Sequence, residues 1–191
     1  IAHNLHLYHK IVQRLVQWRA DARVTRIRNL ALLVTGLSLG TGIHLSEIVS
    51  EWPLASRDPS LVNRLWRFLA NTEVDVAAWY RPVAEQLVAP FVGQPLRLVI
   101  DATKVGFGHR LLVIGLAYRK RTSPLVWSVH EGVRGHTSVN AQLALFTRGA
   151  ALLPRDAEIW VMGDTEFQHV PLLRWLYKRH CHFVIRQKGA V

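Results

Sequence analysis

Two aspartates, Asp101 and Asp164, are the side chains of this chain best suited to chemistry. Each directly follows a short, mainly apolar run that is typical of a buried strand, residues 96–100 for the first and 159–163 for the second. A carboxylate at the end of a buried strand is costly to desolvate unless a cation neutralises it. Two such carboxylates on neighbouring strands would supply oxygen ligands to a divalent metal pair, as phosphoryl transfer requires.

Both aspartates also have a structural interpretation, which the sequence alone leaves open. Asp101 would cap a turn over residues 101–103, and Asp164 would be the N-cap of a helix that begins near Phe167. Glu166 is either a substitute for a third acid or a first-turn carboxylate that favours the helix dipole. For each aspartate taken singly, the capping role is the commoner one, so metal ligation depends on the two acting together.

The charge balance predicts a polyanionic partner. The chain carries 24 Lys+Arg against 13 Asp+Glu, a formal net charge of +11, and its pI is near 10.8. Residues 1–94 have a net charge of +3, whereas residues 95–191, which contain both aspartates, have +8. Nucleic acid or an anionic membrane surface would be attracted to such a chain, and a generic basic surface is the alternative.

Basic residues near the ends of the expected strands are the candidates for contacts with DNA phosphates: Lys104, Arg110, Arg186 and Lys188. Solvated surface positions would explain each of them equally well. The run 180–182, His-Cys-His, is the densest group of metal-binding residue types, but no second Cys/His pair lies at a structural-zinc spacing. We therefore expect no zinc site there.

Other sequence signals exclude further classes of protein. Cys181 is the single cysteine, which excludes an intramolecular disulfide and favours a cytoplasmic location. No stretch approaches the roughly 20 uninterrupted apolar residues of a membrane span, and no signal-peptide pattern is present. The chain begins with Ile1 and its single methionine is Met162, so we expect a fragment that is truncated at both ends.

The elements that would position these residues fall into two regions, 1–94 and 95–191. Helical periodicity in the first region predicts helices near residues 5–18, 22–37, 44–51, 60–69 and 74–88. The second region predicts strands over 96–101, 110–118 and 124–130, a helix capped by Thr137 or Ser138, a strand ending at Asp164, a helix bearing Phe167 and Val170 on one face, and a strand over 182–186. Hairpins followed by helical crossovers predict a mixed α/β sheet with the order β-β-β-α-β-α-β.

Three segments give residues 95–190 a resemblance to a known family. They are residues 98–103, residues 124–127 running on to 135–138, and residues 163–167 followed by Leu172, Leu173, 182–186 and Lys188. They resemble the catalytic domain of DDE-type insertion-sequence transposases, in the branch with a Tyr-Arg-Glu-Lys signature. The second-acid block of that family commonly has Arg-Gly before its Phe, whereas this chain has Thr165-Glu166.

The resemblance implies an incomplete ribonuclease-H-like fold and a bacterial, nucleoid-associated enzyme that hydrolyses phosphodiesters and transfers strands at transposon ends. Asp101 and Asp164 would be its catalytic and metal-ligating residues, with Mg²⁺ or Mn²⁺ as cofactor. Its partners would be double-stranded DNA and a second copy of the chain in the synaptic complex. The helices of residues 1–94 would bind DNA or mediate dimerisation.

The family's third acid is expected beyond Val191, so this chain alone is expected neither to cut nor to join DNA. Two alternatives stay open at this point. One is a non-catalytic or domesticated DNA-binding protein that kept the fold. The other is a structure-selective nuclease on the same scaffold.

We expect DNA binding by this chain to tolerate changes of DNA sequence and to depend strongly on salt. Phosphate neutralisation releases condensed counterions, so the logarithm of the binding constant should fall linearly with the logarithm of salt concentration, by about 0.9 per phosphate contacted. Titration of a fluorescent duplex at several salt concentrations measures this slope. A binding constant that stays flat across the series would contradict the prediction.

Overall fold

The computed structural model describes residues 2–54, 58–132 and 137–187. It divides into two compact units, residues 1–79 and 80–191. The sequence placed this boundary at 94–95, later than the structure does. The reason is packing: Ala84 and Val88 are buried in the core of the sheet unit. Tyr80 joins them there, because its hydroxyl donates to the Pro124 carbonyl at 2.6 Å and burial raises its pKa.

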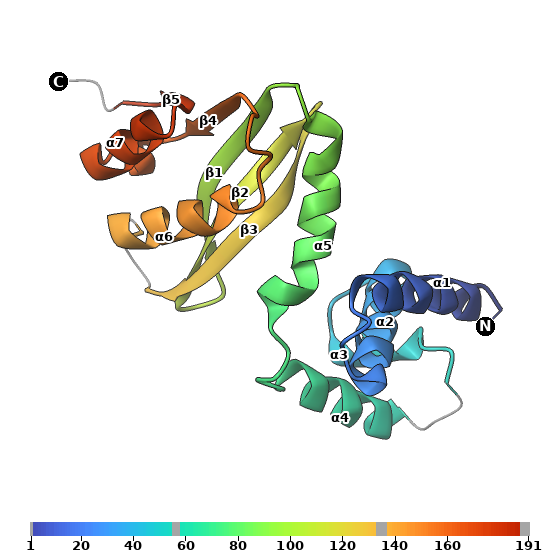
Figure 1. The fold of residues 1–191 in the computed structure, drawn as a ribbon. Helices are drawn as coiled ribbons and strands as arrows, with labels where there is room; N and C mark the ends of the chain where they lie inside the picture. The colour runs from blue at the N-terminus through green and yellow to red at the C-terminus, as the bar shows by residue number, and fades with distance from the viewer. Residues whose placement is uncertain (1, 55–57, 133–136, 188–191) are drawn as a thin grey trace. The chain divides into compact units, whose positions relative to one another are not determined.

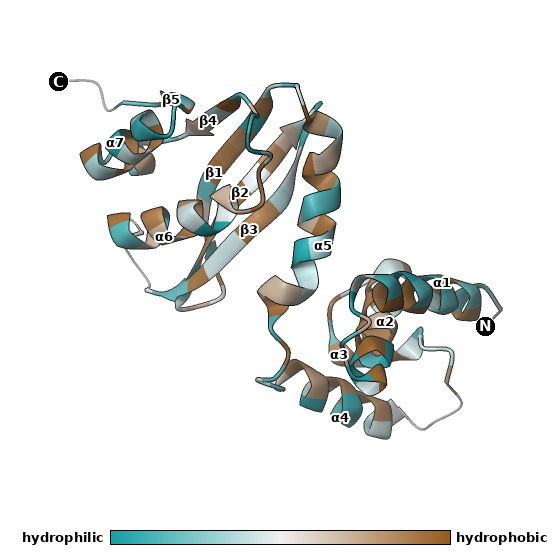
Figure 2. Ribbon diagram, in the orientation of Figure 1, coloured by the Kyte–Doolittle hydropathy of each residue, from teal (hydrophilic) through white to brown (hydrophobic). Residues whose placement is uncertain are grey.

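The first unit is helical, as predicted. Its helices are α1 (Ala2–Trp18), α2 (Val24–Leu39), α3 (Leu45–Ser50), α4 (Asp58–Leu69) and the first residues of α5 (Val76–Val88). Hydrophobic and hydrophilic residues alternate along α4 (Figure 2), and its buried Leu61 and Leu65 pack with Leu32 of α2. Gly36 lets α2 approach α3 closely, because a Cβ there would collide with the Ile48 carbonyl.

The second unit is a mixed α/β fold, which confirms the coarse fold class predicted from the sequence. Its elements are η1 (Ala89–Phe91), β1 (Leu96–Val105), β2 (His109–Tyr118), β3 (Arg121–Glu131), α6 (Val139–Ala150), β4 (Ile159–Gly163), η2 (Thr165–Phe167), α7 (Val170–Lys178) and β5 (His182–Ile185). The five strands lie in the order β3-β2-β1-β4-β5. β1 and β3 are antiparallel to β2, whereas β4 is parallel to both β1 and β5.

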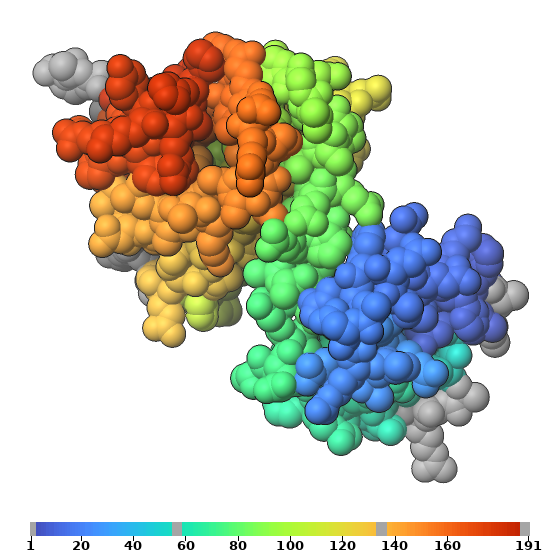
Figure 3. All heavy atoms as spheres, viewed as in Figure 1, coloured from blue at the N-terminus to red at the C-terminus, as the bar shows by residue number. Residues whose placement is uncertain are grey.

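One face of the sheet carries the apolar core. Side chains alternate along each strand, and Leu98 and Ile100 of β1 share their buried face with Ile114 of β2. Helix α6 lies over this face (Figure 1), and in the space-filling view orange atoms of α6 and the segment after it hide most of the strands (Figure 3). Ser138 is the N-cap of α6, accepting from the Ala141 amide at 3.2 Å.

Strand β1 is longer than the sequence predicted. It continues through Val105 by pairing with β2, so Asp101 lies inside a strand opposite Val113 and not in a turn. The turn comes at residues 106–108, where Gly106 has a φ of 59°. That backbone conformation favours glycine, which explains why the hairpin closes there and not after Asp101.

The helix expected from Phe167 is two separate elements. The 3-10 turn η2 buries Phe167 completely, and α7 begins only at Val170, whose side chain is 62% exposed. Pro171 in the first turn of α7 explains the break, because in a continuous helix it could not donate a hydrogen bond to the Phe167 carbonyl and its ring would collide with that carbonyl. The prediction that Val170 lies on the buried face is therefore wrong.

No helix in the described ranges combines the length and the apolar character that crossing a membrane would require.

Replacing Gly163 with alanine should destabilise the sheet unit, because the added methyl group has no room. A Cβ there would lie 2.9 Å from Ile100, 3.0 Å from the Phe167 ring and 3.1 Å from Ile185. Such overpacking costs about 1–3 kcal/mol. The matched control is Gly108→Ala, since a Cβ at Gly108 meets nothing within 4 Å. Urea unfolding measures the stability of both variants. Equal unfolding midpoints would show that the core around Gly163 rearranges to accommodate the methyl group.

Candidate metal and nucleic-acid site

Asp101 lies in β1, and Asp164 directly follows the adjacent parallel strand β4. β1 is the central strand of the sheet, and β4 pairs with it up to Val99 and Met162. Continuing that register by two residues sets Asp164 level with Asp101. Alternation places both side chains on the face opposite the apolar core, and both are exposed. The two carboxylates are therefore open to solvent on one face of the sheet.

Arg186 extends this arrangement onto a third strand. β5 pairs in parallel with β4, with Gly163 opposite Ile185, and the Arg186 amide donates to the Gly163 carbonyl at 3.1 Å. The next step of the register sets Arg186 level with Asp164, and its side chain is exposed. We call Asp101, Asp164 and Arg186 the aspartate row. It combines two carboxylates with one guanidinium, the charges needed to hold a cation and a phosphate together.

Asp164 also has a structural role. Its Oδ1 accepts a hydrogen bond from the Glu166 amide at 2.9 Å, which caps the η2 turn. The capping role proposed from the sequence is thus present, although the capped element is a 3-10 turn and not a longer helix. A carboxylate has about four lone-pair sites, so one cap bond leaves Asp164 able to bind a cation.

Glu166 is not placed as a third metal ligand. Its side chain is 7% exposed, and its Oε1 accepts from the amide and the hydroxyl of Thr137 at 2.6 and 2.7 Å. Its Oε2 lies 3.0 Å from Nη2 of Arg110. Gln142 of α6 in turn donates to the carbonyl and hydroxyl of Thr137, both at 3.2 Å. This network ties η2 to β2 and to the start of α6.

The four basic residues predicted to contact DNA separate in the structure. Arg186 joins the aspartate row. Lys104 is exposed, but alternation along β1 points it to the face opposite Asp101. Arg110 pairs with Glu166 and its side chain is only 21% exposed, so its placement is that of a structural residue. Lys188 lies outside the described residues.

Sequence reasoning missed the partnership of Thr137, Gln142 and Arg110 with Glu166. Thr137 was expected at most as a helix cap, and Gln142 was not singled out. Both are buried, and a buried polar side chain needs hydrogen-bond partners. The available signal was a glutamate beside the buried Phe167, but its partners Thr137 and Arg110 are 29 and 56 residues away along the chain and only the fold brings them together.

The donor set of the aspartate row fits a hard divalent cation. Mg²⁺ is commonly held by one or two carboxylates, with waters and substrate phosphates completing its shell. Asp101 and Asp164 supply two carboxylates of this kind, exposed where a phosphate could approach. Within residues 2–54, 58–132 and 137–187, no group of three or more His, Cys, Asp or Glu side chains is arranged to hold a metal. A cation bound at the row would therefore need further ligands from water or a substrate.

The residues of the 180–182 run have other surroundings. The His182 ring stacks on Trp160 with centroids 4.4 Å apart, and its Nε2 lies 3.5 Å from Glu158. His180 has a φ of 55° in the turn before β5. Cys181 is half-buried, and its burial raises the pKa of the thiol, which keeps the thiol protonated and a poor metal ligand.

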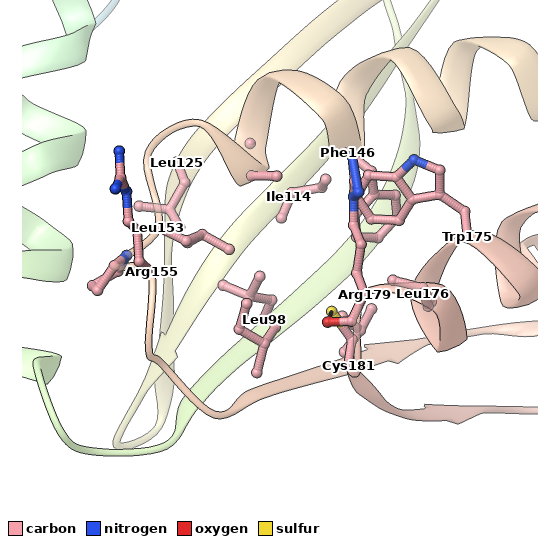
Figure 4. Close-up of a pocket in the computed structure, with 15 residues that line it drawn as sticks. Leu98, Ile114, Leu125, Phe146, Leu153, Arg155, Trp175, Leu176, Arg179 and Cys181 are labelled. Atoms are coloured by element: carbon pink, nitrogen blue, oxygen red, sulfur yellow. Dashed lines mark hydrogen bonds between the residues drawn. The ribbon is translucent and has the colours of Figure 1, made fainter.

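An apolar pocket of about 290 Å³ lies on the other side of the sheet. Leu98, Ile114 and Phe146 line it beneath α6, with Arg179 and Cys181 near the end of α7 (Figure 4). Leu98 and Ile114 belong to the buried face, opposite the face of Asp101. This pocket is therefore separate from the aspartate row.

No protein-family model matches the chain, and no curated protein is significantly similar to it. The chemistry assigned to the aspartate row consequently follows from the residues and their geometry.

The Arg110–Glu166 pair should show strong energetic coupling. Removing one partner leaves the other charge poorly compensated in a buried setting, so Arg110→Met and Glu166→Gln should each destabilise the protein by about 3–5 kcal/mol. The double variant should lose less than the sum, with a coupling energy of about 1–3 kcal/mol. Urea unfolding of the four proteins gives this cycle. Arg121→Met, at an exposed strand end, is the control. Additive losses of stability in the Arg110 and Glu166 variants would contradict the coupling.

Proposed function

We propose that this chain belongs to a DDE-type insertion-sequence transposase, which performs metal-dependent phosphodiester hydrolysis and strand transfer at transposon ends. One observation carries the proposal. The parallel register of β1 and β4, paired up to Val99 and Met162, would set Asp101 and Asp164 level if it continued by two residues, and both side chains are exposed. Two exposed carboxylates in register are the minimal ligand set for phosphoryl transfer assisted by metal ions.

The topology supports a ribonuclease-H-like assignment of the sheet unit. Three antiparallel strands are followed along the chain by two parallel ones, and β1 lies between β2 and β4. Asp101 lies in the first strand and Asp164 directly follows the fourth, where the resemblance in sequence places the first two acids of the family. Residues 135 and 136, which belong to the resemblance in sequence, lie outside the described residues. Support for the proposal therefore comes from the other segments of that resemblance.

Each residue of the aspartate row has a distinct task in this proposal. Asp101 and Asp164 bind divalent cations and orient them toward a phosphodiester. A cation held there supplies Lewis-acid stabilisation of negative charge at phosphorus and at the leaving oxygen. Arg186 binds a non-bridging phosphate oxygen, since guanidinium groups form charge-assisted bonds with phosphates. The net charge of +8 over residues 95–191 draws DNA to this unit.

A DNA-binding protein without cleavage activity is the second candidate. It is favoured by the engagement of Glu166, which is buried with Arg110 and Thr137 and so does not add a third carboxylate to the row. In-line displacement needs its metal ions in a fixed geometry, which two exposed carboxylates alone do not enforce. This candidate predicts DNA binding that is indifferent to Mg²⁺ and Mn²⁺.

Metal-dependent activity should depend on both aspartates. We expect Mn²⁺ to broaden the NMR signals of residues around Asp101 and Asp164 in this chain. Asp101→Asn and Asp164→Asn should each abolish that effect, because a neutral amide is a much weaker ligand. Asp156→Asn, another exposed aspartate of the same unit, is the matched control. Broadening that survives both row variants would place the metal elsewhere and end the proposal.

Cleavage is the decisive assay for the transposase itself. This chain alone should not cut DNA that carries the element's ends. The chain fused to a segment that supplies a third acid should cut it with Mg²⁺ or Mn²⁺. Asp101→Asn or Asp164→Asn in that fusion should abolish cutting, while Asp156→Asn leaves it intact. Cutting by this chain that is lost on mutating Asp101 would show that a third ligand is already present in it.

A further inference from the structure

A polar pocket in the helical unit collects four arginines. Arg23 and Arg26 stand at the start of α2, and Arg64 and Arg67 stand on α4. The pocket has a volume of about 500 Å³, and the buried Phe68 contributes to its lining. Four arginine side chains line this one hollow, and like charges gathered in one place repel each other unless anions compensate them.

Two of the four guanidinium groups are held in place by neighbours. Arg64 donates from Nε to Oδ1 of Asn29 at 2.8 Å and lies over the Trp52 ring at 5.9 Å. Arg26 lies 3.3 Å from the carboxylate of Glu73, and its side chain is only 21% exposed. These contacts orient both groups before any ligand arrives, which reduces the entropy lost on binding.

The other two arginines are exposed and available. Arg23 has no hydrogen-bond or ion-pair partner among the described residues, and Arg67 donates only to the Asn63 carbonyl of its own helix. Glu73 is the one carboxylate paired with any of the four arginines in the part of the chain that the structure describes. The pocket thus has an excess of three positive charges.

We propose that this pocket binds consecutive phosphates of a nucleic-acid strand. Arginine forks bind phosphate oxygens in pairs, and the excess charge exceeds what a single phosphate dianion neutralises. Three consecutive phosphodiesters, or a free nucleoside triphosphate, match it better. The inference rests on the proposed function for assigning the phosphates to DNA. It adds a phosphate-binding site on the helical unit that requires neither Asp101 nor a metal.

The test compares two double variants of this chain in buffer containing EDTA, so that binding is measured without metal chemistry. Arg23→Gln with Arg67→Gln removes the two exposed pocket charges. Lys10→Gln with Arg28→Gln removes two exposed charges of the same unit that do not line the pocket. Fluorescence anisotropy gives the affinity for duplex and single-stranded DNA at several salt concentrations, and competition with ATP probes the free triphosphate. Circular dichroism verifies that both variants are folded.

The pocket variant should bind DNA more weakly, and its salt slope should fall by about 1.8, which is 0.9 for each lost phosphate contact. The control variant should keep a slope close to that of the unmodified chain. Equal losses in both variants would overturn the proposal in favour of diffuse charge. Unchanged DNA binding by the pocket variant, together with ATP that fails to displace DNA from the unmodified chain, would also overturn it, because the pocket would then not hold DNA. These measurements do not involve cleavage. A failure of this proposal can therefore be distinguished from a failure of the transposase proposal, which the cleavage assay tests.

Discussion

The buried carboxylate of Glu166 is the constraint on which the arrangement of the sheet unit depends. A charge that is almost removed from water must be compensated, and Arg110 and Thr137 provide the compensation. Arg110 belongs to β2, Thr137 precedes α6, and Glu166 follows β4, so one carboxylate joins three segments that are distant in sequence. Asp164 is positioned as a result, because it caps the same turn that carries Glu166.

The central strand β1 pairs with β2 on one side and with β4 on the other. Its hairpin with β2 is local in sequence, whereas its pairing with β4 requires the chain to cross over through α6. Only this crossover brings Asp164 next to Asp101. The covered face supplies the apolar packing that stabilises the unit. Away from that face, the side chains of Asp101 and Asp164 are exposed to solvent.

Much of this fold could be predicted from the sequence, since periodicity and turn residues are local signals. The helices of residues 1–94, the Ser138 cap and the apolar strands all follow from such signals. The length of β1 could not be predicted in this way, because the end of a strand depends on its partner strand. Pairing with β2 continues β1 beyond the apolar run, so that Asp101 lies inside the strand. The bond between Arg110 and Glu166 could not be predicted for the same reason, because it joins residues 56 positions apart along the chain.

The cap formed by Asp164 has an evolutionary consequence. Asparagine accepts the same cap hydrogen bond as aspartate and is about as good an N-cap, so position 164 can lose its charge without losing the η2 turn. Position 101 makes no such bond within the described residues and is free to drift further. In a descendant that has abandoned catalysis, substitution should therefore be broad at 101 and confined to short polar side chains at 164. The two positions would then diverge at different rates.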